Sequence, residues 1–83
     1  MEENFYVFTF YSTHLALDFE KNLEDKFKIK LIPVPRQISS SCGLAGKIRK
    51  EDLKEIKEYC NNHNLEYDNV YEISPNQEPK KIC

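Results

Sequence analysis

The sequence predicts an α+β domain in which two helices cover one face of an antiparallel four-stranded sheet. The chain has 83 residues, which suffices for one domain with a small core. Its composition, 40% hydrophobic and 31% charged, is typical of a folded globular chain. Four segments with strand character and two with helical periodicity follow one another in the order β-α-β-β-α-β.

The first strand and the first helix are predicted within residues 4–27. Asn4 to Tyr11 gives the strongest strand signal, because most of its residues are aromatic or β-branched. Ser12 follows, and its hydroxyl can accept a hydrogen bond from the free N–H groups that open a helix. Apolar residues then recur three or four positions apart and share one helical face, namely Ala16, Phe19, Leu23 and Phe27.

The middle of the chain is predicted to form two strands joined by a loop. Residues 29–34 read as a short strand, and Pro33, which has no N–H to donate, indicates that it lies at the edge of the sheet. Residues 35–43 hold a proline, three consecutive serines and a glycine, which is typical of a loop. Residues 44–49 alternate apolar and other side chains, as a strand does.

A second helix and a last strand are predicted for the C-terminal part. Two acidic residues, Glu51 and Asp52, stand where the helix dipole favours negative charge, and several asparagines after residue 60 end the helix. Its buried face holds apolar residues at helical spacing: Leu53, Ile56 and Cys60. Residues 66–73 form the last strand. We therefore expect a single domain over residues 1–74 and a flexible tail over residues 75–83.

These elements indicate a ferredoxin-like βαββαβ two-layer sandwich with the antiparallel sheet order 4-1-3-2. A two-layer fold leaves one sheet face without helices, yet the first strand has bulky residues on both of its faces: Tyr6, Phe8 and Phe10 on one, Phe5 and Val7 on the other. We therefore expect a partner surface on the open face, such as a homodimer interface. The alternative is that the C-terminal tail folds over it.

Charge and hydropathy exclude several classes of function. The chain has 12 Lys and Arg against 14 Asp and Glu, so its formal net charge is -2 and no overall positive field attracts nucleic acid. No apolar run approaches the ~18 residues of a membrane span, and the start Met1-Glu2-Glu3 lacks the basic residues of a signal peptide. We expect a cytoplasmic protein that binds neither nucleic acid nor membranes.

The three cysteines, Cys42, Cys60 and Cys83, predict free thiols. Their number is odd and no two of them form a C-x-x-C pair, which argues against a disulfide framework. With His14 and His63 they show no metal-ligand spacing, so we expect no metal site. Cys60 continues the apolar face of the second helix and is predicted to lie in the core. Cys83 falls in the tail, and its role stays open.

The segment 36–43 holds the candidate functional residue, Cys42. The first and second strands of the predicted fold are parallel, so the loop after the second strand lies beside the start of the first helix. A helix N-terminus or an arginine stabilises a thiolate, which is the nucleophilic form of cysteine. The residues expected to support Cys42 are Ser12, Thr13, His14, Arg36, Ser39, Ser40, Ser41 and Gly43. The alternative is that Cys42 packs as a small hydrophobic residue.

About residues 5–73 resemble the selenium/sulfur (Se/S) carrier protein-like family. The resemblance rests on Thr9 to Ala16, on Pro-x-Pro-Arg at 33–36, and on Ser-Ser-Ser-Cys-Gly at 39–43. It implies that Cys42 carries sulfur or selenium as a persulfide or perselenide, with no other cofactor. It also implies a donor such as a cysteine desulfurase and an acceptor protein. Another sulfur-relay family uses a Cys-Pro-x-Pro motif, whereas here the prolines precede the cysteine, so that mechanism does not transfer.

Two other functions stay open at this point. The chain can be a non-catalytic regulatory module, in which Cys42 only packs while Arg36 and the serines bind a small anion or a partner protein. It can also be a thiol enzyme such as a peroxidase or reductase, although the sequence places no second cysteine to resolve an intermediate. A carrier differs from both in holding a chalcogen atom on Cys42 without turnover.

Overall fold

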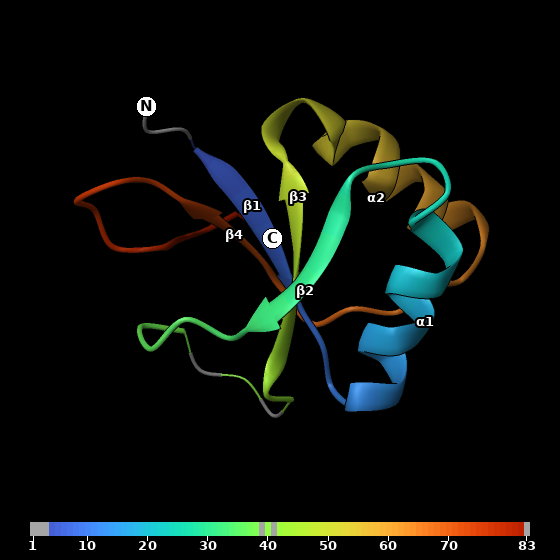
Figure 1. The fold of residues 1–83 in the computed structure, drawn as a ribbon, viewed down its shortest axis with the longest axis horizontal. Helices are drawn as coiled ribbons and strands as arrows, with labels where there is room; N and C mark the ends of the chain where they lie inside the picture. Colours follow the sequence, from blue (N-terminus) through green and yellow to red (C-terminus); the bar gives the residue numbers. More distant parts are fainter. Residues whose placement is uncertain (1–3, 39, 41, 83) are drawn as a thin grey trace.

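The computed structural model describes residues 4–38, 40 and 42–82, and it contains the expected βαββαβ succession (Figure 1). A short 3-10 helix, η1, and a fifth strand, β5, are additional. The elements are β1 (Phe5–Thr9), α1 (Thr13–Leu23), β2 (Ile29–Pro33), β3 (Leu44–Arg49), η1 (Lys50–Asp52), α2 (Leu53–Asn62), β4 (Val70–Ile73) and β5 (Lys80–Lys81).

The sheet is antiparallel throughout, with the strand order β2-β3-β1-β4-β5. The edge position that Pro33 predicted for β2 is confirmed. The expected four-strand order 4-1-3-2 is incomplete, because β5 extends the sheet beyond β4. Asn76, with φ at 60°, lets the chain turn back along β4. Two lysines carry little strand signal of their own, so only this pairing makes them a strand.

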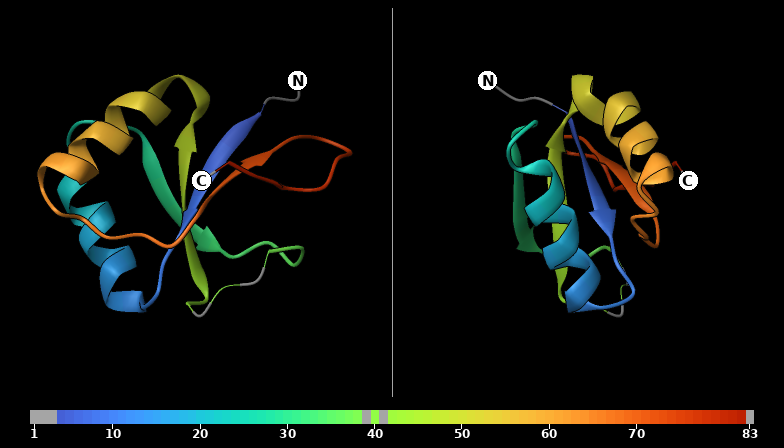
Figure 2. Two further views of the ribbon diagram at one scale, coloured as in Figure 1. Left: turned by 180° about the vertical axis from the view of Figure 1, so that it is seen from behind. Right: turned by 90° about the vertical axis from the view of Figure 1, so that its right-hand side faces the viewer.

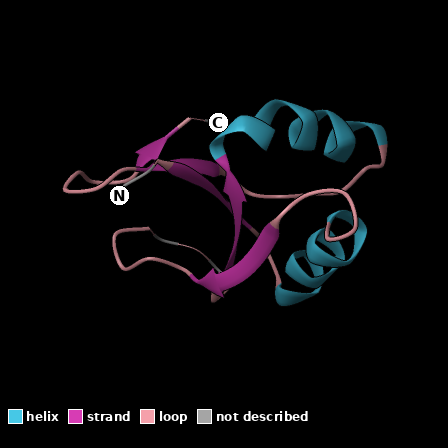
Figure 3. Ribbon diagram, turned by 45° about the horizontal axis from the view of Figure 1, so that its top comes forward, coloured by secondary structure: helices cyan, strands magenta, loops and turns pink. Residues whose placement is uncertain are grey.

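Both helices lie on one face of the sheet and enclose the main core (Figures 2 and 3). Phe19 of α1 is central, because its ring centroid lies 5.0 Å from that of Phe8 and 5.1 Å from that of Phe10. Gly46 of β3 makes room for it: a Cβ added there would lie 2.8 Å from Phe19 Cε1. The glycine is therefore required by the close approach of α1 to β3.

The ends of the elements follow local hydrogen bonds. The Ser12 hydroxyl caps α1 by accepting from the Leu15 N–H at 3.3 Å, as predicted. The helix α2 ends at Asn62, and Asn64 adopts a left-handed φ of 56°. The last strand begins at Val70 and is shorter than the expected 66–73. Just before it, Asn69 bonds to the buried Thr9 of β1, donating its N–H to Thr9 Oγ1 at 3.1 Å and accepting from the Thr9 N–H at 2.8 Å.

The face without helices is covered in part by the chain's own loop. Val7 is fully buried and Ile38 is 6% exposed, and these two pack with Ala45 in a second apolar cluster. The described part of the segment after residue 74 pairs with the edge of the sheet through β5. Ile38 thus covers part of the surface where we expected a partner, and a homodimer through that face stays a prediction.

Candidate functional site

The loop between β2 and β3 lies at the end of the sheet where α1 begins. Both β1 and β2 are antiparallel to β3 and hence parallel to each other, so the loop and the helix start meet there (Figure 1). The Val34 N–H donates to the Gly43 carbonyl at 3.1 Å and closes the base of the loop. The Ser40 hydroxyl donates to the Phe10 carbonyl at 3.4 Å and ties the loop to the end of β1.

The sulfur of Cys42 lies in this junction, on the helix side of the sheet. The residue is 3% exposed and belongs to the main core cluster. Two polar groups nevertheless reach the sulfur: the Leu44 N–H donates to Sγ at 3.4 Å, and Thr13 Oγ1 lies 3.7 Å away. Cys42 is therefore packed in the core, and its sulfur also has two polar contacts; its functional role stays a prediction.

The expected supporting residues are brought together only in part. Thr13 contacts the sulfur, and Ser40 accepts a hydrogen bond from the Cys42 N–H at 3.3 Å. Ser12 uses its hydroxyl to cap α1. Gly43 is exposed, and its carbonyl accepts at the base of the loop. Neither a positive φ nor a close neighbour within 4 Å requires glycine at that position.

Two of the expected supporting residues, His14 and Arg36, are not bonded to Cys42. The His14 side chain is 82% exposed, and its Nε2 lies 3.3 Å from Asp18 Oδ2, one turn further along α1. Arg36 is exposed. Within residues 4–38, 40 and 42–82, no hydrogen bond or ion pair joins either of them to Cys42. Ser39 and Ser41 lie outside the described residues.

Cys60 provides the contrast to Cys42. It is 1% exposed within the main core, as predicted, and desolvation raises the pKa of its thiol to about 11. Both described cysteines, Cys42 and Cys60, are free thiols. Cys83 lies outside the described residues. At neutral pH Cys60 is almost entirely protonated, so it is a poor nucleophile.

Sequence reasoning missed that the loop is anchored on both faces of the sheet. Ile38 packs on the face without helices, and Cys42, four residues later, enters the core on the helix face. A lone isoleucine within a polar loop was the available signal, since such a residue seeks an apolar partner. The loop therefore straddles the end of the sheet, with Ile38 on one face and Cys42 on the other.

In the part of the chain that the structure describes, no group of three or more His, Cys, Asp or Glu could hold a metal ion, and no helix is long and apolar enough to cross a membrane. A family model described as "Putative Se/S carrier protein-like" matches residues 5–72. The match includes Cys42 and both segments that contact it. No curated protein and no solved structure matches the chain.

Proposed function

Because the chain belongs to this Se/S carrier protein-like family, we propose that it is a sulfur or selenium carrier whose cargo is bound covalently to Cys42. The observation that supports this role is the pair of polar contacts to Cys42 Sγ, from the Leu44 N–H and from the Thr13 hydroxyl. We also class the domain as ferredoxin-like, with β5 as an added edge strand. Its compartment under this proposal is the cytoplasm, where reducing conditions keep thiols free.

Loading is a thiol exchange that needs no external oxidant. The Cys42 thiolate attacks the outer sulfur of a persulfide on a donor such as a cysteine desulfurase. A new S–S bond forms on Cys42, the S–S bond of the donor breaks, and the donor cysteine leaves as a thiolate. Delivery repeats the exchange, with an acceptor thiolate attacking the outer sulfur. The same steps apply to selenium.

The structure around Cys42 supports two features of this chemistry. Thr13 is the first residue of α1, and its hydroxyl can donate to a negative outer sulfur. The positive end of the helix dipole favours the same charge. Since only 3% of Cys42 is exposed, a donor reaches the sulfur only when the loop that carries it moves outward. The contacts of Ser40 and Ile38 hold that loop in place.

The test is mass spectrometry after incubation with a cysteine desulfurase and cysteine. We expect the mass of one sulfur atom on the peptide that contains Cys42. Cys42→Ser should abolish the gain, and the matched control Cys60→Ser should retain it. Thr13→Val, which keeps the side-chain shape without the hydroxyl, should lower the loaded fraction. Loading of Cys42→Ser equal to that of the parent chain would exclude the proposal.

The burial of Cys42 favours a second candidate, a non-catalytic module that binds a small anion or a partner protein. In that case Cys42 is a packing residue, and Cys42→Ala should leave partner binding unchanged. If the desulfurase does not increase the alkylation rate of Cys42, this candidate is favoured over the carrier.

A further inference from the structure

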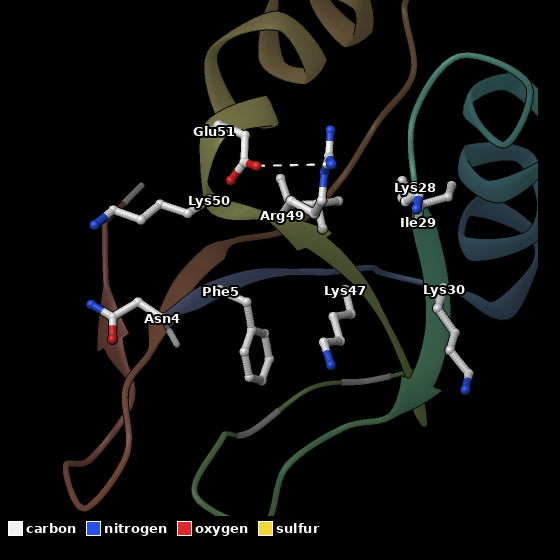
Figure 4. Close-up of a pocket in the computed structure, with 10 residues that line it drawn as sticks. Asn4, Phe5, Lys28, Ile29, Lys30, Lys47, Arg49, Lys50 and Glu51 are labelled. Carbon is white, nitrogen blue, oxygen red and sulfur yellow. Dashed lines mark ion pairs between the residues drawn. The ribbon is translucent and has the colours of Figure 1, made fainter. Parts of the chain in front are cut away.

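A second feature lies at the opposite end of β3 from Cys42. A cavity of about 540 Å³ opens there between the starts of β1 and β2 and the end of β3 (Figure 4). Its charged lining consists of Lys28, Lys30, Lys47, Arg49, Lys50 and Glu51. Because β3 begins next to the Cys42 loop and ends at this cavity, the two sites are separate.

The cavity gathers positive charge in a chain that is negative overall. Five of the chain's 12 Lys and Arg line it, with one of its 14 acidic residues. Arg49 is neutralised locally, since its Nε lies 3.0 Å from Asp52 Oδ2 and its Nη1 lies 3.8 Å from Glu51 Oε2. Among the described residues, the four lysines make no ion pair. They therefore leave a positive field that an anionic partner can neutralise.

Two of these lysines lie opposite each other on neighbouring strands. Lys30 of β2 and Lys47 of β3 are register partners, so their side chains share one face. Like charges in this arrangement destabilise a sheet. Lys47 Nζ lies 4.5 Å from the centroid of the Phe5 ring, which offsets part of the cost. Figure 4 shows Phe5, Lys47 and Lys30 side by side on neighbouring strands. An anion placed against the pair would remove the repulsion.

The outer edge of β2 lies next to these lysines and has no partner strand among the described residues. The Val34 N–H donates to Gly43 in the direction of β3, and N–H groups alternate in direction along an antiparallel strand. The N–H groups of Ile29 and Leu31 therefore point to the outer edge, where no described strand pairs with β2. An added strand would place every second side chain on the face of Lys30, about 7 Å apart.

We propose that the β2 edge and this cavity bind an extended acidic segment of a partner protein. The segment pairs with the outward N–H and C=O groups of β2 as an additional strand. Its carboxylates lie against Lys30 and reach Lys28, while Lys47, whose Nζ lies over the Phe5 ring of β1, adds to the positive field from farther away. The charge complementarity fixes the chemistry of the partner, and the free edge fixes its extended conformation. This goes beyond the carrier role, since it stands whether or not Cys42 is loaded.

The test is a titration of the full chain, followed by NMR, with a blocked peptide in which glutamate and valine alternate. We expect the largest shifts at the amides of Ile29 and Leu31. Lys30→Glu should weaken binding about tenfold or more, since it replaces an attraction by a repulsion, and Lys47→Glu should weaken it by a smaller factor, since Lys47 lies farther from the β2 edge. The matched control Lys54→Glu changes an exposed lysine of α2 outside the cavity and should leave the affinity unchanged. A peptide N-methylated at alternate residues should bind more weakly, because it cannot pair with β2.

Other results would overturn the proposal. Equal binding of a peptide with glutamine in place of glutamate would show that charge is not recognised. Shifts with tripolyphosphate but none with the peptide would assign the cavity to a small phosphate anion. A dimer of the chain through β2, or no shift at millimolar peptide, would equally contradict it.

Discussion

Replacement of Ile38 by alanine should expose the thiol of Cys42. Ile38 is 6% exposed and fixes the loop on the face without helices, whereas Cys42 enters the main core at the other end of the same loop. The substitution removes the apolar contact of Ile38 with Val7 and Ala45. It leaves the hydrogen bonds to the Cys42 sulfur in place. The loop should therefore open more often while the rest of the domain stays folded.

The size of the effect follows from the burial. Truncation of a buried isoleucine to alanine costs about 2–5 kcal/mol. Ile38 belongs to a small cluster with two other buried residues, so we take the lower end, about 2 kcal/mol. Each 1.4 kcal/mol changes an equilibrium tenfold, so the open population of the loop should rise about 30-fold. When opening and closing are fast, the alkylation rate of Cys42 rises by the same factor.

The assay is site-resolved alkylation with iodoacetamide, followed by mass spectrometry in a Cys83→Ser background. Cys60 is the internal reference, because it lies in the main core and reacts only when that core opens. Ile38→Ala should accelerate Cys42 about 30-fold relative to Cys60. The control Ile48→Ala truncates a residue of the main core and should accelerate both thiols. Equal acceleration of both thiols by Ile38→Ala, or an unchanged Cys42 rate, would refute the coupling between Ile38 and Cys42.

Three further predictions concern stability and are tested by chemical denaturation. Gly46→Ala should lower the free energy of unfolding by about 1–3 kcal/mol, because the added Cβ would lie 2.8 Å from Phe19 Cε1. Adding Phe19→Leu to this variant should recover part of the lost stability. Ser12→Ala should cost about 1 kcal/mol by removing the cap of α1, and Ser12→Asp should restore it. Burial raises the pKa of Cys60 from 9.0 to about 11, so the folded state binds this proton more tightly than the unfolded state does. The free energy of unfolding should therefore fall as the pH rises from 9 to about 11. Cys60→Ala should remove that part of the pH dependence.

Local sequence patterns determined most of the secondary structure. The helical spacing of Ala16, Phe19 and Leu23 and the capping hydroxyl of Ser12 predicted α1, because these signals act within a few residues of each other. Pro33 predicted an edge strand for the same reason, since a missing N–H is a property of one residue. The family is likewise a property of the sequence, and the prediction of it is confirmed over residues 5–72.

The composition of the site was decided by tertiary structure. The parallel arrangement of β1 and β2 predicted that the loop would lie beside Thr13, and Thr13 Oγ1 lies 3.7 Å from Cys42 Sγ. The contact between His14 and Asp18 follows the i,i+4 spacing of α1, a signal that the prediction for His14 did not use. That Arg36 stays exposed depends on a side-chain direction that no spacing encodes. The burial of Cys42 likewise follows from the way the loop straddles the sheet.

The same division holds for the sheet and the lysine-lined cavity. The chain by itself determined that β2 and β3 are strands and that they carry lysines. Only the register of the two strands places Lys30 opposite Lys47. Only the turn at Asn76 brings Lys80 and Lys81 beside β4, where they pair with it as β5. Strand pairing joins residues far apart in the chain, so its energy depends on partners that no local pattern identifies.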